Sequence, residues 1–446
     1  MLHRSLWEKG KSGFSSLNRN KSEVLFSLLI IFLPTQFGKH FWPDFAYLLG
    51  FRIDYLSPTL FFTDCLVLLL FLSVLLAKQK RLQCQDFFSR HKLFFLLLGV
   101  LLIVNTCVAL SLPLAVYGDV KLLEFLFVGI YAAGFIRRSE IPRLTFLLVI
   151  SGTGESILAI WQHIWQRSVG GIFYLVGERQ FTAQTPGIAN ASVDGHLILR
   201  PYGTLPHPNV LAGFLLSALI FAVFLLKRFS GAKRALVIVF LGLGSVALLL
   251  SLSRMVIILW ILLTLWWTLS LAWRKLGKKW ILGFCLGILL LGTLLLLRFF
   301  PDAVIRLVGT RLSETAITTR IVLLSQGLTL VSRHPLLGVG LDNMLPALAA
   351  LSPKEYPWQL QPVHMIYLAG LIEVGVMGML FFLYFLVLTI KRCSVLIKEK
   401  SMHLQLPIVL AFVCLLAIGF VDHYSVTLQQ GQLLFSVMAG LIWIRK

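Results

Sequence analysis

Long apolar runs recur along the whole chain, and they constrain its fold more than any other feature. A run of about 20 apolar residues has the length that a helix needs to cross the hydrocarbon core of a bilayer. With 58% hydrophobic and 13% charged residues over 446 positions, the chain has more apolar surface than a soluble core of this size would bury. The sequence therefore predicts an all-α polytopic membrane protein.

The apolar runs predict about twelve transmembrane helices, of which the first is the shortest. No repeat relates the two halves and no low-complexity linker separates them, so we expect a single membrane domain over residues 1–446. The basic N-terminus lacks a small-residue cleavage site, which is typical of an uncleaved anchor. The predicted spans cover residues 23–38, 57–77, 92–112, 114–136, 142–165, 206–226, 233–252, 254–273, 279–299, 363–390, 404–422 and 424–444.

The positions of the basic residues indicate how the spans are oriented. The formal net charge is +21, and Lys and Arg gather in short clusters that all fall on one side if every run crosses once. By the positive-inside rule that side is the cytoplasm, where both termini would lie. No basic stripe or tail is present, so we do not expect a nucleic acid partner. The two large loops, residues 166–205 and 301–363, would then lie outside.

The larger outer loop, residues 301–363, is too long to be only a connector. Residues 313–333 begin with an N-cap serine, continue with apolar residues at helical spacing and end before a Pro signal, which predicts an amphipathic helix at the outer membrane surface. The smaller loop, residues 166–205, contains GHLILRPYGT. This alternating run between Gly and Pro signals predicts a short hairpin.

Four polar residues lie on the predicted outer side. Arg200, Arg254 and His364 stand near the ends of spans, and Arg320 stands on the predicted amphipathic helix. Taken singly, Arg200 suits an interfacial anchor, Arg320 a solvated charge and His364 a cap, whereas Arg254 suits anchoring and function equally. Taken together, they suit a lipid-linked pyrophosphate substrate, because guanidinium groups bind phosphoryl oxygens and an imidazole can take a proton from an attacking hydroxyl. The sequence holds no metal-ligand cluster and no nucleotide-binding motif, so we expect no cofactor.

The C-terminal part of the chain, about 250 residues, resembles the O-antigen ligase and polymerase superfamily of bacterial membrane glycosyltransferases. The resemblance is carried by RPYGTLPHPNVLAG from residue 200, SLSR from residue 251, SRHPLLGVGLDN from residue 332 and H-x-x-Y-L-x-x-x-x-E-x-G from residue 364, a signature region over residues 200–375. It implies transfer of a glycan from undecaprenyl pyrophosphate to an acceptor hydroxyl. The reaction would take place at the periplasmic face of the inner membrane, without metal and with inversion.

The resemblance also implies roles for single residues. Arg200 and Arg254 would hold the pyrophosphate, and His364 would act as the base or orient the acceptor. The family often has asparagine after this histidine, whereas Met365 follows here, so the acceptor contact of that asparagine is not expected. Residues 334–340 are expected to shape the backbone. Asp422 and His423 would either reach the same substrate cavity or form an interhelical polar pair. The candidate substrate-binding residues are Arg320, His334, Asp342, His207 and His423.

The residues leave the acceptor open. The acceptor could be the lipid A-core, a growing glycan or a protein, so ligase, chain polymerase and O-linked protein oligosaccharyltransferase are alternatives. A transporter or flippase for lipid-linked sugars is the competing class, because Asp64, Glu124 and Glu155, buried within spans that contact membrane lipids, would also suit transport. The polar residues gather at one face of the membrane, however, which favours an enzyme.

Overall fold

The computed structural model of the chain describes residues 21–193, 196–275, 314–351, 360–398 and 402–444. These residues are mostly helical, as predicted, and they include three two-stranded antiparallel sheets. A helical segment over residues 21–31 comes first. The longer helices that follow are α2 (Phe62–Leu76), α3 (Lys78–Arg90), α4 (Lys92–Cys107), α5 (Leu112–Phe135), α6 (Ile141–Trp165), α8 (Pro208–Leu225), α9 (Gly231–Leu250), α10 (Arg254–Lys275), α13 (Glu314–Arg333), α14 (Met344–Leu351), α15 (Ile366–Lys398), α16 (Met402–Ile418) and α18 (Gln429–Ile442).

The remaining elements are short and lie between these helices. The strands are β1 (Gly38–His40), β2 (Tyr47–Leu48), β3 (Phe51–Arg52), β4 (Thr59–Phe61), β5 (Asn190–Val193) and β6 (His196–Leu199). Strand β5 pairs with β6, which confirms the hairpin predicted in the 166–205 loop. The short helices are η1 (Asp44–Ala46), η2 (Asp54–Leu56), η3 (Arg138–Glu140), α7 (Ile172–Leu175) and α17 (Tyr424–Thr427).

Four helices in the described part of the chain are long and apolar enough to cross a membrane, or up to five if the bent pair α2 and α3 counts as one span. The four cover Arg138–Trp165, Pro208–Leu225, Gly231–Leu250 and Ile366–Leu396. The predicted count of about twelve is therefore not confirmed. The predicted span 279–299 lies outside the described residues. The first predicted span, 23–38, is shorter than expected, because the helix ends at residue 31 and the chain turns into strand β1.

Two predicted spans are interrupted. The predicted span 424–444 consists of α17 and α18, which Leu428 separates with an extended backbone. Helix α15 breaks at Gly375, whose φ of 61° lies in the left-handed region. A Cβ at this position would meet the Leu336 carbonyl oxygen at 2.4 Å, so only glycine fits this close approach. Apolar periodicity alone did not reveal either break.

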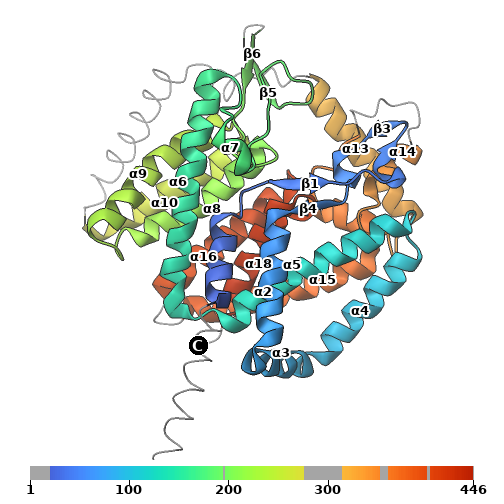
Figure 1. The fold of residues 1–446 in the computed structure, drawn as a ribbon, viewed down its shortest axis with the longest axis horizontal. Coiled ribbons are helices and arrows are strands. Elements are labelled where there is room, and N and C mark those ends of the chain that lie inside the picture. Colours follow the sequence, from blue (N-terminus) through green and yellow to red (C-terminus); the bar gives the residue numbers. More distant parts are fainter. Residues whose placement is uncertain (1–20, 194–195, 276–313, 352–359, 399–401, 445–446) are drawn as a thin grey trace, which may run out of the picture.

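The basic segment 78–92, predicted as a cytoplasmic loop, is largely helical. Helix α3 bends by 96° from α2, and none of its described side chains is buried. The Lys80 ammonium lies over the rings of Tyr131 and Phe135 near the C-terminal end of α5, and it donates a hydrogen bond to Ser22 Oγ. Helix α3, with its basic residues, thus lies at one end of the molecule, while the β5–β6 hairpin lies at the opposite end (Figure 1).

Helix α8 lies at the centre of the molecule. It packs against α6, α9 and α16, and 89% of its apolar stretch is buried inside the protein. Gly213 allows this packing, because a Cβ there would meet the Tyr424 hydroxyl oxygen at 1.8 Å. The helix begins at Pro208, which suits a first helical position because proline needs no backbone N–H partner there. The first turn of this buried helix carries the residues around which the candidate site is built.

Candidate functional site

The RPYGT segment is held by two buried side chains of α6. Gln162 Oε1 accepts hydrogen bonds from the backbone N–H groups of Tyr202 and Gly203, at 2.9 and 2.8 Å. The Glu155 carboxylate accepts from Thr204 N at 2.7 Å and Thr204 Oγ1 at 2.6 Å. Gly203 has φ 61°, and a Cβ there would lie 2.1 Å from Glu155 Oε2. These contacts fix the residues on either side of the turn, Arg200 and His207.

Arg200 is half-buried and joins two further segments. Its Nε donates to the Ser251 carbonyl oxygen at 2.7 Å, and its Nη2 donates to Asn209 Oδ1 at 2.7 Å. Ser251 begins the SLSR turn, in which Leu252 takes a left-handed backbone conformation with φ 55°. The half-buried Arg254 follows as the first residue of α10. The structure thus brings the SLSR turn and Arg200 together, although they are far apart in the sequence.

Asp422 connects this group to the C-terminal helices. Its Oδ2 accepts from Asn209 Nδ2 at 2.6 Å, and its Oδ1 accepts from the backbone N–H of His423 at 2.8 Å. The side chain is buried, with 8% of the residue exposed. Burial acts to raise the pKa of Asp422, but nearby histidines and the Asn209 hydrogen bond together hold it below its usual value. Asp422 is therefore an interhelical partner of Asn209, and through Asn209 it belongs to the same hydrogen-bonded group as Arg200.

Two histidines meet beside Asp422. The rings of His364 and His423 are 5.1 Å apart at 88°, and His423 Nδ1 lies 2.5 Å from Thr427 Oγ1. Thr427 Oγ1 donates to the His423 carbonyl oxygen, so it accepts from Nδ1 and leaves His423 Nε2 as a proton acceptor. His364 Nδ1 is buried and has no hydrogen-bond partner within the described residues.

The surroundings keep both rings neutral near pH 7. Burial is the largest effect and lowers the pKa of His364 below its ordinary value, against the opposing charge of Asp422. Burial likewise lowers the pKa of His423 to about 4. Because only a neutral imidazole can accept a proton, both side chains are in the form that a general base requires.

His207 has a structural role that the sequence did not indicate. Its Nδ1 accepts a hydrogen bond from Asn209 N at 3.1 Å and caps the N-terminus of α8. Burial and then the charge of Arg200 lower the pKa of His207 to about 3, so this ring is neutral as well. A substrate contact by His207 stays a prediction.

The other predicted site residues lie in different places. Arg320 is exposed on α13, and its charge contributes to the lowered pKa of His364 and His423, so it lies within electrostatic range of the histidine pair. His334 is exposed just beyond the end of α13. Asp342 lies near Asp119 and Lys121 of α5, and burial raises its pKa to about 7. No hydrogen bond, ion pair or ring contact joins His334 or Asp342 to the Arg200 and His423 group in the described part of the chain.

The Gly-rich segment after α13 shapes the backbone, in keeping with its predicted role. Gly338 and Gly340 have φ of 72° and 101°, and Gly340 N donates to the Glu373 carbonyl oxygen at 3.0 Å. Asn105 of α4 donates to the carbonyl oxygens of Leu337 and Glu373, at 2.7 and 2.9 Å. This segment therefore packs on the break in α15. The helix predicted over 313–333 is confirmed as α13, whose Leu323 and Leu330 are buried, while the part of the outer loop over 301–313 and 352–359 lies outside the described residues.

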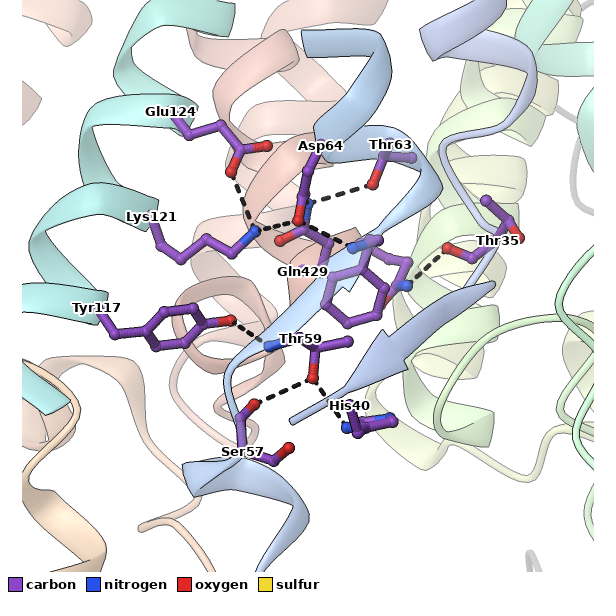
Figure 2. Close-up of polar contacts among 12 residues, drawn as sticks. Thr35, His40, Ser57, Thr59, Thr63, Asp64, Tyr117, Lys121, Glu124 and Gln429 are labelled. Carbon is purple, nitrogen blue, oxygen red and sulfur yellow. Dashed lines mark hydrogen bonds and ion pairs between the residues drawn. The ribbon is translucent and has the colours of Figure 1, made fainter. Parts of the chain in front are cut away.

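A second polar cluster joins α2, α5 and α18 (Figure 2). Lys121 donates to Asp64 at 2.7 Å and to Glu124 at 3.0 Å, and Gln429 donates to Thr63 at 3.2 Å and to Asp64. Asp64, Glu124 and Glu155 are the acids that would suit a transporter. Asp64 and Glu155 make contacts that hold helices or loops together, and Glu124 pairs with Lys121 within α5. These contacts give the acids a structural role.

Sequence reasoning missed Asn209, Tyr55 and Thr427. Asn209 follows Pro208 in the HPN triplet, and a polar residue in the first turn of a deeply apolar helix was a usable signal. Tyr55 contacts His423, with ring centroids 5.9 Å apart, but nothing in its local sequence indicates this. Thr427 lies one helical turn after His423, which is also visible only once the segment is known to be helical.

The fold and this group of residues define a helical membrane protein. Its polar site lies at the same end of the helices as the β5–β6 hairpin. Residues 238–383 match the family model for O-antigen ligase, a segment that contains Arg254, Arg320 and His364. This match confirms the resemblance to the O-antigen ligase and polymerase superfamily. It supports a bacterial membrane enzyme with glycosyltransferase-like activity on a lipid-linked glycan and an acceptor. No curated protein matches the chain.

The lowered pKa values predict that acid destabilises the fold through the histidines. The folded pKa of His423 is about 4, below the ordinary histidine value of 6.5, so the unfolded state binds more protons between these values. The stability contributed by neutral His423 should be present above pH 6.5 and lost as the pH falls towards 4. We expect the Tm of the purified protein to drop over this range, measured by thermal unfolding in detergent.

His423→Asn is the matched control for this prediction. The asparagine Nδ2 can donate to Thr427 in place of the ring Nδ1, but it does not titrate. The variant should lose less Tm than the wild type between pH 7 and pH 4.5. Equal losses in both proteins would contradict the lowered pKa of His423.

Proposed function

We propose that this protein transfers a glycan from undecaprenyl pyrophosphate to an acceptor hydroxyl, as in ligation of O-antigen to lipid A-core. One observation carries the proposal. Arg200 bonds to Asn209, which bonds to Asp422, and to the Ser251 carbonyl oxygen in the turn that leads to Arg254. The neutral His423 follows Asp422 and contacts the neutral His364. Cations for a leaving pyrophosphate and a base for a nucleophile are the two requirements of the reaction.

The proposed reaction needs no metal and inverts the anomeric carbon. The acceptor oxygen forms a bond to the anomeric carbon from the face opposite the pyrophosphate. The bond between that carbon and the phosphoryl oxygen breaks, and its electron pair leaves with undecaprenyl pyrophosphate. His364 takes the proton of the acceptor hydroxyl, while Arg200 and Arg254 balance the negative charge that grows on the leaving group. Arg320 would add a further contact to phosphate or sugar.

The direct test incubates the purified protein with a polyprenyl pyrophosphate-linked O-antigen repeat unit and three acceptors separately. The acceptors are lipid A-core, the glycan chain itself and a Ser/Thr-rich peptide. We expect release of undecaprenyl pyrophosphate to depend on lipid A-core and to yield the glycosylated product by mass spectrometry. Transfer only to the glycan would make the protein a polymerase, and no transfer to any acceptor would contradict the proposed function.

The proposed site faces the periplasm, and both termini face the cytoplasm of the inner membrane. This orientation predicts that a cysteine at Gln184, in the loop after α6, is labelled from outside. A cysteine at Ser230, the N-cap of α9 on a basic connection, should react only after the inner membrane is permeabilised. The test uses a membrane-impermeant maleimide on cells with a permeable outer envelope, in a background without native cysteines. Labelling in the reverse order would invert the proposed orientation.

A further inference from the structure

The segment before α2 contributes a side chain to the histidine pair. Tyr55 lies in η2 and is 39% exposed, and its ring meets the His423 ring at 5.9 Å and 66°. His423 in turn contacts His364 at 5.1 Å. A molecule that binds at the exposed Tyr55 would therefore lie next to the two neutral histidines. The O-antigen ligase match does not include this segment.

An exposed cation from the 166–205 loop lies close to this tyrosine. The Arg179 guanidinium carbon is 6.0 Å from the centre of the Tyr202 ring. The Tyr202 ring in turn lies 6.1 Å from the ring of His207 at the start of α8, and the charge of Arg179 acts on the Tyr55 phenol, so Arg179 borders the same surface as Tyr55. Tyr202 is only 2% exposed, and its hydroxyl accepts from Ala189 N at 2.7 Å, so it forms a fixed support. Arg179 itself makes no hydrogen bond or ion pair within the described residues.

Two more polar side chains belong to the same surface. Asp54 is exposed beside Tyr55, and its charge acts on both Tyr55 and His40. The His40 ring stacks on Trp42 at 5.7 Å, and its Nδ1 lies 2.8 Å from Thr59 Oγ1 (Figure 2). The surface thus combines a guanidinium, a carboxylate, a phenol and an imidazole with exposed aromatic faces. A small number of polar groups that converge among aromatic rings is typical of sites that orient a small polar ligand.

The mixed charge of this surface discriminates between the two substrates. A pyrophosphate would be repelled by the Asp54 carboxylate, whereas sugar hydroxyls can both donate to a carboxylate and accept from a guanidinium. Arg200 is joined to the SLSR turn and to Asn209, and Arg179 is joined to neither. The surface around Tyr55 therefore suits a sugar better than it suits the lipid-linked diphosphate.

We propose that Tyr55, Asp54 and Arg179 form the subsite for the acceptor sugar, whose attacking hydroxyl is thereby presented to His364 and His423. This inference rests on the proposed function, because it assigns one of the two substrates of that reaction to a place in the structure. It also assigns a role to a part of the chain that lies before the signature region.

The test measures steady-state transfer to lipid A-core by the Arg179→Ala and Tyr55→Ala variants. Removing a hydrogen-bonding charged partner should raise the KM for the acceptor by about tenfold or more. The KM for the lipid-linked donor and the kcat at saturating acceptor should stay within about twofold of wild type. Arg167→Ala is the matched control, because it removes an exposed arginine from the same loop and should leave all three constants unchanged.

A binding measurement separates this subsite from the proposed reaction. Lipid A-core is titrated onto the detergent-solubilised protein without any donor, and the Kd is compared among wild type, Arg179→Ala and Arg167→Ala. A Kd raised about tenfold only in Arg179→Ala supports the subsite, even if transfer from the pyrophosphate donor fails. An unchanged Kd, or a raised KM for the donor in place of the acceptor, overturns it. Thermal unfolding of each variant checks that the fold is retained.

Discussion

His364→Ala should reduce glycan transfer by roughly 10²–10⁴-fold while leaving expression and donor binding nearly intact. A hydroxyl is a poor nucleophile until its proton is taken, and general-base assistance contributes about this factor. His364 is the candidate because its ring is held against His423, near Asp422, at the entrance of α15. The measurement is single-turnover transfer together with donor affinity.

The pH profile separates a base from other roles of His364. Burial lowers the pKa of this ring below 6.5, so wild-type activity should fall only as the pH drops below that value. The sign follows because the neutral form accepts the proton and acid removes it. If His364 only orients the acceptor, His364→Gln should restore much of the rate and remove the acidic limb. A role limited to stability would leave the rate per folded molecule unchanged in the Ala variant.

Arg254→Lys should keep the positive charge and the fold but lose most activity, by roughly 10²-fold or more. An ammonium cannot make the planar, two-pronged contact that a guanidinium makes with phosphoryl oxygens. Arg254 begins α10 directly after the turn that Arg200 holds through the Ser251 carbonyl oxygen. Initial rates at saturating donor and acceptor measure the effect.

The control is Arg333→Lys, at the exposed C-terminal end of α13, which should have normal rates. Arg200→Lys should behave like the Arg254 variant with more residual activity, because the lysine still places a charge beside Asn209. Near-normal turnover of Arg254→Lys would instead assign this residue to membrane anchoring.

Local sequence was sufficient for several features of the fold. Apolar length predicted the helical membrane class, and turn signals predicted the β5–β6 hairpin and the α13 helix. These features depend on neighbouring residues, so periodicity and capping preferences describe them well. The break of α15 at Gly375 was not predicted, because it depends on the close approach of the Leu336 carbonyl oxygen from another segment of the chain.

The candidate site was only partly accessible from the sequence. The motifs supplied Arg200, Arg254 and His364, and the structure places the first two in adjoining segments and the third beside His423. It did not place Asp342 there, since this residue packs towards α5 instead. A motif records which residues occur together in a family, but it does not distinguish those that bind substrate from those that shape a loop.

The sequence by itself determined that this chain is a helical membrane protein that resembles the O-antigen ligase and polymerase superfamily, because hydropathy and short motifs are local properties. Only the tertiary structure decided that Asn209 bonds to Asp422, and that Tyr55 meets His423. Each of these contacts joins residues more than two hundred positions apart. Their geometry follows from how apolar helices pack and which glycines let them approach, and hydropathy does not specify which helix faces which.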